Sequence, residues 1–368
     1  MKNKLRSFTI ITLMFTVFLI FTPVVSAKTR QSYLTDFLFQ NQIGNEKFGT
    51  SYKDTSYALE IIDYYNLYEI QGLFGPETKV DIPTFIENLE TKVQEMFDDG
   101  EIELYDLYYL LNSLDILNGL ETLDSEYKDK IHEYINQTEQ ISGGYAVTNT
   151  SASANMVSTY IVYNIYSLLD EPIFNQTTHL NWILMCNNTD GGYGGNQTLS
   201  SNILTTYCAV YLVSQLATID YLYNKTATLN YLLSFYCDDP LDLDNYGGFL
   251  PDLIANNALL SSTYYCIESI ELIDDSTLNP TATIKWILDR QNFQDGGFLD
   301  DPSEHEEGLS SIPATYHAFK ILYILNALDN LNQDFFMVEF NYIILIVVLS
   351  VIGIIAVIIV FIWRKRKL

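Results

Sequence analysis

Residues Lys285–Leu325 read KWILDRQNFQDGGFLDDPSEHEEGLSSIPATYHAFKILYIL, and this stretch decides the fold. It opens in an amphipathic segment that begins after Asn279-Pro280, a typical helix start, and ends at Gly296-Gly297. Paired glycines supply the positive φ angles that a helix end and a sharp reversal need. After a polar loop, Ser311 can cap a second segment that is apolar on nearly every face. The stretch therefore predicts two helices joined by a loop, the second of them covered on all sides.

The same arrangement recurs along the chain. A glycine-containing aromatic loop precedes a tyrosine with a hydroxyl-bearing neighbour, as in Gly191-Gly192-Tyr193 before Thr206-Tyr207. Tyr108 fills a gap in the series, where the loop has lost its glycine-aromatic signature. A repeat of about 50 residues indicates stacked helix pairs, because one pair cannot bury its inner helix alone. The tyrosines that mark the other repeats are Tyr57, Tyr160, Tyr207, Tyr264 and Tyr316.

The motif resembles the repeat of protein prenyltransferase β subunits and terpenoid cyclases. Gln-x-x-x-Asp-Gly-Gly-Phe begins at Gln291, and small-Thr-Tyr-x-Ala begins at Ala314. The resemblance covers roughly residues 31–328 and implies an all-α fold, an α/α toroid (α6/α6 barrel) of six helix-pair repeats around a central cavity. Outer helices are predicted near 31–41, 83–97, 124–137, 177–187, 226–237 and 281–291, and inner helices near 54–68, 103–118, 155–169, 203–218, 258–272 and 311–328.

The charge excludes nucleic acid as a partner. The chain of 368 residues has a formal net charge of −27, and seven of its 19 basic residues lie near its two ends. Phosphates require a basic face, which the acidic middle of the chain does not offer. We interpret the acidity as a solvated exterior.

The two ends predict a membrane protein. Residues 1–27 combine a basic start, an apolar run and a small-x-small end, as in a cleaved signal peptide, with an uncleaved anchor as the alternative. Residues 342–363 are uncharged and long enough to span the cell membrane as one transmembrane helix. The basic residues 364–367 place the tail, 364–368, in the cytoplasm and the toroid with its tether, 28–341, outside. Six glycosylation sequences agree with this extracellular placement, at Asn136, Asn149, Asn175, Asn187, Asn196 and Asn224.

The resemblance directs attention to zinc, which protein prenyltransferases hold with an Asp-x-Cys pair and a histidine. Ser262 and Tyr264 stand in the places of the aspartate and the cysteine, and only His317 matches the ligand histidine. One histidine cannot replace the charge of a thiolate and a carboxylate, so no cofactor is expected. His317 is interpreted as a polar residue that lines the cavity.

Two acidic strings have functional and structural interpretations. Asp242-Leu243-Asp244-Asn245 comes closest to the Asp-x-Asp-Asp acid of terpenoid cyclases, but it precedes Gly247-Gly248 and is interpreted as a solvated loop. Calcium is a weaker alternative there or nearby, since the spacing completes no helix-loop-helix calcium loop. Its candidate ligands are Asp238, Asp239, Asp242 and Asp244, or Asn188 with Asp190.

The four cysteines occupy equivalent positions on adjacent repeats. Cys186 and Cys237 end outer helices, and Cys208 and Cys266 lie near the starts of inner helices. Outside the cell these pairs can form two disulfides, Cys186–Cys237 and Cys208–Cys266. Four buried thiols are the alternative, because cysteine is a common core residue.

The aromatic residues indicate a ligand cavity. Tyrosines with an apolar ring and a polar tip suit a hydrophobic or mixed ligand, although packing between helices explains many of them. The cavity-lining candidates are Tyr57, Tyr160, Tyr207, Tyr264, Tyr316 and His317. The remaining histidines, His132, His179 and His305, are expected on solvated surfaces.

Three functions remain open. The leading hypothesis is a membrane-anchored extracellular toroid that binds a hydrophobic ligand or a protein partner through its cavity or rim. An active transferase or cyclase with non-standard residues is the first alternative. A sugar-active α/α-barrel enzyme is the second, and it needs two carboxylates facing each other across the cavity mouth. The inner helices offer Glu60, Asp63, Asp106, Glu268, Glu271 and Lys320 for such chemistry.

Overall fold

The computed structural model describes residues 27–72, 75–274, 278–301 and 310–336. It divides into two units, of which the larger is Arg30–Asn332. In the smaller unit, β1 (Ala27–Thr29) pairs antiparallel with β6 (Asp334–Phe336). The predicted signal peptide (all but its last residue), transmembrane helix and cytoplasmic tail lie outside the described residues. Within the described ranges, no helix has the length and apolar character needed to cross a membrane.

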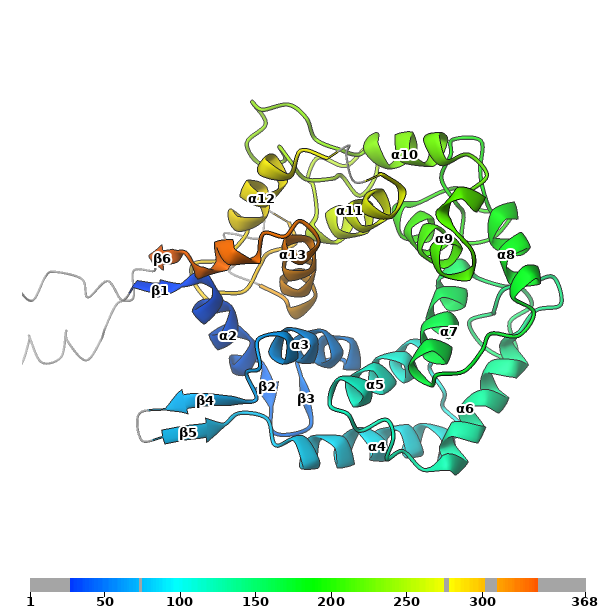
Figure 1. Ribbon diagram of the computed structural model, residues 1–368, viewed down its shortest axis with the longest axis horizontal. Helices are drawn as coiled ribbons and strands as arrows, with labels where there is room; N and C mark the ends of the chain where they lie inside the picture. Colours follow the sequence, from blue (N-terminus) through cyan, green and yellow to red (C-terminus); the bar gives the residue numbers. More distant parts are fainter. Residues whose placement is uncertain (1–26, 73–74, 275–277, 302–309, 337–368) are drawn as a thin grey trace, which may run out of the picture. The chain divides into compact units, whose positions relative to one another are not determined.

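The larger unit is the predicted toroid of twelve helices (Figure 1). Inner helices contact their neighbours all the way round, and α13 closes the ring against α3. The inner helices are α3 (Tyr52–Tyr64), α5 (Leu104–Ile116), α7 (Met156–Leu168), α9 (Ile203–Leu216), α11 (Leu260–Asp274) and α13 (Ile312–Ile324). The outer helices are α2 (Arg30–Gln40), α4 (Ile82–Asp98), α6 (Ser125–Thr138), α8 (Gln176–Met185), α10 (Lys225–Leu233) and α12 (Pro280–Leu288).

Short elements occupy the connections between these helices. Two hairpins lie in the first two repeats, and two 3-10 helices follow α9 and α13. The apolar core takes fully buried leucine and isoleucine side chains from both inner and outer helices, among them Leu34 on α2 and Leu107 on α5. The short elements are β2 (Gln42–Ile43), β3 (Lys47–Phe48), β4 (Glu69–Gly72), β5 (Gly75–Thr78), η1 (Ile219–Tyr221) and η4 (Leu328–Asn332).

Four inner helices end earlier than the sequence prediction because asparagine or aspartate reverses the chain. Asn66 follows α3 with φ of 52°, and its amide donates to Asp63 O. The next amide, that of Leu67, donates back to Ile62 O. This pair of bonds satisfies carbonyl groups that the helix end would otherwise leave free. The same left-handed residue follows α5, α7 and α13, at Asn118, Asp170 and Asn326.

The recurring threonine explains why the motif builds the same repeat each time. The amide of Phe249 donates to Thr263 Oγ1 at 3.0 Å, and both residues are fully buried. The bond fixes the aromatic residue of the loop against the first turns of the following inner helix. The equivalent pairs are Phe48 with Thr55, Tyr145 with Thr159, Tyr193 with Thr206 and Phe298 with Thr315.

Glycine pairs bring four of the loops against the next outer helix, those at Gly143, Gly191, Gly247 and Gly296. Gly191 has φ of +91°, and a Cβ added there would lie 2.4 Å from the carbonyl oxygen of Ala227 on α10. The last loop makes the equivalent approach to the first outer helix, because a Cβ on Gly296 would lie 2.5 Å from Tyr33 O. Hydrogen bonds stabilise this contact between the last repeat and the first. Gln291 donates to Arg30 O at 2.9 Å, and Arg30 donates to Leu288 O. The ring is therefore closed by the same contact that joins successive repeats.

Candidate functional site

A cavity of about 360 Å³ opens among the N-terminal halves of the six inner helices. All five marker tyrosines line it, and four further tyrosines from α5 and α11 join them. These are Tyr57, Tyr105, Tyr108, Tyr109, Tyr160, Tyr207, Tyr264, Tyr265 and Tyr316. Because every repeat contributes its second helical turn to the axis of the ring, a residue type repeated at this position surrounds the cavity on all sides.

The tyrosine side chains form a packed and neutral lining. Tyr57 and Tyr316 stack with ring centroids 3.7 Å apart, and the hydroxyls of Tyr160 and Tyr207 are 3.1 Å apart. Burial raises the pKa of Tyr207 and of Tyr264 well above the ordinary value, so their hydroxyls stay protonated. The lining offers aromatic surface together with hydroxyl groups that can donate or accept hydrogen bonds.

A carboxylate behind the lining anchors Tyr316. The Tyr316 hydroxyl donates to Glu60 Oε2 at 2.7 Å, and Lys320 Nζ donates to Glu60 Oε1 at 2.6 Å. Two of the six charged candidates on the inner helices therefore neutralise each other. Asp63 is likewise engaged, since it accepts a hydrogen bond from Tyr68 at 2.7 Å.

His317 is buried beside the cavity without a hydrogen-bond partner among the described residues, and Glu268 has one such oxygen while its carboxyl group interacts with the hydroxyls of Tyr264 and Tyr207. His317 is buried and stacks on Tyr264 with ring centroids 5.2 Å apart, and neither ring nitrogen has a hydrogen-bond partner among the described residues. Burial lowers the pKa of His317 to about 3, so the ring is neutral. Glu268 Oε2 is also buried and unpartnered, and burial raises the pKa of Glu268. Neither residue belongs to the cavity lining itself.

Two charged residues stand among the described residues that line the cavity, Lys53 and Asp106. The half-buried Lys53 ammonium lies 5.4 Å from the centroid of the Tyr57 ring, and it forms none of the ion pairs found in the described ranges. Burial lowers the pKa of Lys53, and burial together with Glu103 raises the pKa of Asp106. Asp54 and Asp300 oppose this lowering of the Lys53 pKa, but neither forms an ion pair with Lys53 among the described contacts.

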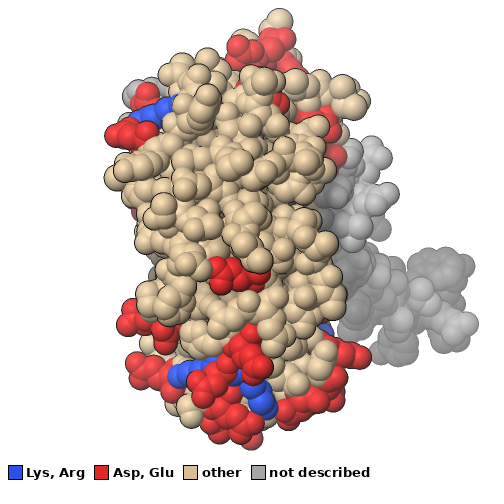
Figure 2. All heavy atoms as spheres, turned by 90° about the vertical axis from the view of Figure 1, so that its right-hand side faces the viewer, with Lys and Arg blue, Asp and Glu red and all other residues tan. Residues whose placement is uncertain are grey.

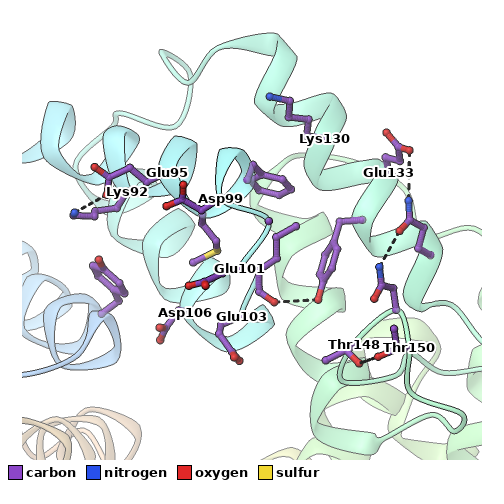
Figure 3. A pocket seen from close by; sticks show the side chains of 18 residues that line it. Lys92, Glu95, Asp99, Glu101, Glu103, Asp106, Lys130, Glu133, Thr148 and Thr150 are labelled. Atoms are coloured by element: carbon purple, nitrogen blue, oxygen red, sulfur yellow. Dashed lines mark hydrogen bonds and ion pairs between the residues drawn. The ribbon is translucent and has the colours of Figure 1, made fainter.

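An acidic groove of about 940 Å³ adjoins the cavity and shares Asp106 with it (Figure 3). Asp99, Glu101 and Glu103 come from the loop between α4 and α5, and Glu133 comes from α6. Both lysines of the groove are already paired, Lys92 with Glu95 at 2.6 Å and Lys130 with Glu126 at 2.9 Å. The acidic groove is mostly exposed, which agrees with a solvated exterior.

The residues beside His317 do not fit zinc. Tyr264 meets the imidazole with its ring face, and Ser262 supplies neither a thiolate nor a carboxylate. In the described part of the chain, no group of three His, Cys, Asp or Glu side chains is placed to hold a metal ion. Three of the calcium candidates accept hydrogen bonds in local turns: Asp239 from Leu241, Asp242 from Asn245 and Asp190 from Gly192. Asp242 and Asp244 are exposed in the loop after α10, as predicted.

The four cysteines follow the alternative of unpaired thiols. All four are free, and neither of the two disulfide pairings is present. Cys186, Cys208 and Cys266 are buried, and burial raises the pKa of Cys186 to about 12.

His179, expected in solvent, is buried. Its Nδ1 accepts the amide proton of Gly144 at 2.8 Å, and its Nε2 lies 3.4 Å from Glu139 Oε1. Thr228 and Thr283 hold the equivalent place on α10 and α12, where each donates to the glycine turn of the preceding repeat. His179 therefore belongs to the scaffold.

The fold and the site define a class: an α/α toroid whose centre is lined by tyrosines and whose described residues hold no metal set. The chain belongs to the family of the prenyltransferase alpha-alpha toroid domain, whose sequence model matches residues 82–239, 170–257 and 251–342. No curated protein matches the sequence.

Solved structures share the fold at low sequence identity. Protein geranylgeranyltransferase-I from Candida albicans, complexed with GGPP, is 17% identical with a TM-score of 0.55, over 83% of this chain and 86% of that one. The type II terpene cyclase MstE from Scytonema is 11% identical with a TM-score of 0.52, over 82% and 97%. A protein from Actinoplanes is 11% identical with a TM-score of 0.51, over 83% and 100%. At these identities the likeness concerns the fold alone.

Proposed function

We propose that this chain is a membrane-anchored binding protein. Its tyrosine-lined cavity takes a small ligand with an aromatic or apolar body and an anionic head group. The observation that carries the proposal is the Lys53 ammonium at the cavity mouth, half-buried and without a carboxylate partner among the described residues. Desolvation outweighs the attraction of Asp54 and Asp300 in lowering the pKa of Lys53, and an anionic group bound beside the ammonium would offset that cost.

The rest of the cavity supports an apolar body behind this head group. Its walls are tyrosine rings, and the other described lining residues include Val157, Ile161 and Leu204. A volume of about 360 Å³ lies at the small end of the usual range for ligand sites. One lysine suits a carboxylate or a monophosphate, whereas a diphosphate calls for several cations.

The placement outside the cell forms part of the proposal. The apolar segment 342–363 would hold the toroid at the outer face of the membrane, with residues 364–368 inside. The lipid bilayer is then one partner and the cavity ligand another. A protein partner at the rim fits the same placement, and nucleic acid does not fit a chain of this charge.

Matched probes test the binding proposal. We expect 2-naphthylacetate to bind the full-length protein at least about tenfold more tightly than its uncharged amide, a difference of about 1.4 kcal/mol measurable by calorimetry. Lys53→Met should abolish this preference. Lys79→Met is the control, because Lys79 follows the β4–β5 hairpin and pairs with Glu77. Equal binding of both probes, or a preference that survives Lys53→Met, would contradict the proposal.

An active cyclase or transferase is the second candidate, and Glu268 favours it. Burial raises the pKa of Glu268, which favours the protonated carboxyl group that a general acid needs, and the cavity-lining Tyr207 and Tyr264 would stabilise a developing cation. Incubation with a polyprenyl substrate, with and without zinc, should then give a product that Glu268→Gln does not form. The sugar-active alternative lacks its second carboxylate, since Asp106 stands alone among the carboxylates of the described cavity lining.

A further inference from the structure

One side of the toroid is nearly free of charge. Residues 172–237 include three charged side chains, Asp190, Asp220 and Lys225, in a chain that has 46 acidic residues. Figure 2 shows the side of the ring on which α8 lies: uncharged side chains cover most of it, and acidic side chains gather mainly towards its ends. We call the surface formed by residues 172–237 the uncharged face. Something other than ionic groups must hydrate it.

Large apolar side chains are exposed on the uncharged face beside three of the glycosylation sequences. Phe174 is 64% exposed and precedes Asn175, and Tyr223 is 81% exposed and precedes Asn224. Leu199 is 50% exposed and follows the sequence that begins at Asn196. Large contiguous apolar patches mark covered surfaces, whereas a single exposed apolar side chain is ordinary. These three side chains indicate a cover because they occur together on one uncharged face. The sequence beside each of these three side chains supplies an attachment point for a cover.

In these three sequences, all three threonines and two of the three asparagines are exposed, whereas Asn196 is half-buried. Asn175 and Asn224 are exposed immediately before α8 and α10, and the threonines two residues later are exposed as well. Asn175 Nδ2 donates one hydrogen bond, to the side-chain oxygen Glu139 Oε1 at 2.9 Å. Asn196 Oδ1 accepts hydrogen bonds from Thr198 N at 2.9 Å and from Thr198 Oγ1 at 2.8 Å. This arrangement leaves Asn196 Nδ2 without a hydrogen bond in the described part of the chain.

Two other sequences have the same letters and unsuitable structures. Asn187 is half-buried as Asn196 is, but its Nδ2 donates to two backbone carbonyls, Gly191 O and Gly192 O, within a glycine turn. Asn136 lies inside α6, and its Thr138 is fully buried, where it donates to Ile135 O. A glycan on Asn187 would remove both bonds of the turn. The structure thus separates sequences that are indistinguishable by motif.

We propose that N-linked glycans on Asn175, Asn196 and Asn224 cover the uncharged face, an inference that rests on the proposed placement outside the cell. In each attachment, a bond forms between Nδ2 and C1 of a saccharide carried on a polyprenyl phosphate or diphosphate. The lipid phosphate leaves with the electrons of its bond to C1, and the amide loses one proton. The hydroxyl groups of the sugars then hydrate the surface that carboxylates hydrate elsewhere on the toroid.

The experiment is site-resolved glycopeptide mass spectrometry of the full chain, expressed with its own leader in a eukaryotic secretory host. We expect high occupancy at Asn175, Asn196 and Asn224 and at least tenfold lower occupancy at Asn136 and Asn187. Thr→Ala at 177, 198 or 226 should remove one glycan each and spare the asparagine cap of α10, while Thr→Ser at the same positions should retain it. The reverse pattern of occupancy would overturn the inference.

Protease digestion of sealed membranes separates the two levels of the proposal. The lumen of these sealed vesicles corresponds to the outside of the cell. If the toroid is protected from protease there and the three asparagines carry no glycan, the placement stands and the glycan cover is refuted. A bare face that instead captures a second copy of the chain would identify it as a protein interface, which also refutes the cover. If added protease digests the toroid, both the placement and the inference that rests on it are wrong.

Discussion

The repeated threonine is the feature of the fold whose energetic role is most directly testable. We predict that Thr263→Val lowers the free energy of unfolding of the toroid by about 2 kcal/mol. Leaving a buried hydrogen-bond donor without an acceptor costs about 1–3 kcal/mol. Valine has almost the same shape as threonine, so the change opens no cavity. It leaves the Phe249 amide without an acceptor in a fully buried position. Leu259 O, which also accepts from the threonine hydroxyl, keeps its bond from Thr263 N.

Chemical denaturation of the full-length chain, followed by tryptophan fluorescence, measures this change as a shift of the midpoint at constant slope. Thr91→Val is the matched control. Thr91 makes the same hydroxyl-to-carbonyl bond within α4, to Glu87 O at 2.8 Å, but it is exposed and its hydroxyl holds no loop amide within the described ranges. The control should change stability by less than about 0.5 kcal/mol. Thr263→Ser keeps the hydroxyl and should fall closer to wild type than Thr263→Val.

The outcome decides what the motif is for. If Thr263→Val and Thr91→Val shift the midpoint equally, the bond to the loop amide contributes nothing, and the threonine would have to be explained by helix packing alone. That result would also remove the physical link between the glycine-aromatic loop and the inner helix that makes the repeats alike.

Three further outcomes follow from particular contacts. Gly191→Ala should lower the free energy of unfolding by at least about 2 kcal/mol, because it combines a positive φ with a clash against α10. Gly44 has φ of +56° but open space around it, so Gly44→Ala should lower the free energy of unfolding by about 1 kcal/mol in the same denaturation assay. Gln291→Leu should open the ring closure and lower the hydrogen-exchange protection of α2, because it removes the bond to Arg30 O. Burial lowers the pKa of His317 to about 3, while the unfolded value is about 6.5, so the stability that the neutral ring contributes is complete above pH 6.5 and is lost as the pH falls towards 3. His317→Phe should therefore flatten the acid limb of the stability profile, measured as the difference from wild type.

The sequence predicts the twelve helices because the same physical requirements recur in every repeat. Glycine pairs, capping residues and apolar inner segments each mark a boundary that the structure places within a few residues. The errors arise where one residue has two roles. Asn66 looks like an ordinary polar residue within a helix, yet it takes the left-handed conformation that ends α3. In the first repeat, Ser56 separates Tyr57 from Thr55, whereas Tyr160 directly follows Thr159, so the marker tyrosines are not strictly equivalent.

The cavity site is less predictable from the sequence because Lys53, on which the binding proposal rests, differs from the residues at the equivalent position in other repeats. Lys53 is the second residue of α3, and Val157 and Leu204 hold this position in α7 and α9. An alignment of the repeats on their capping residues would have singled out a lysine among apolar equivalents. The prediction that His179 lies on a solvated surface was wrong because its sequence pattern gives no sign of burial. Its helix has apolar residues on several faces, so nothing in the pattern shows that the histidine points at the turn of the neighbouring repeat.

Two sets of positions with different requirements coexist in each repeat. One set, represented by Thr263, Phe249 and the glycine turns, bonds or packs across repeats, and a change there disturbs the ring itself. The other set faces the axis or the outer surface, where side chains can change without affecting closure. Ser262, Tyr264 and His317 belong near the axis, and in the described part of the chain they form no metal site although the ring is intact. It follows that family membership constrains the first set, and that the function of this chain has to be sought in the second: the Lys53 ammonium at the cavity mouth and the uncharged face.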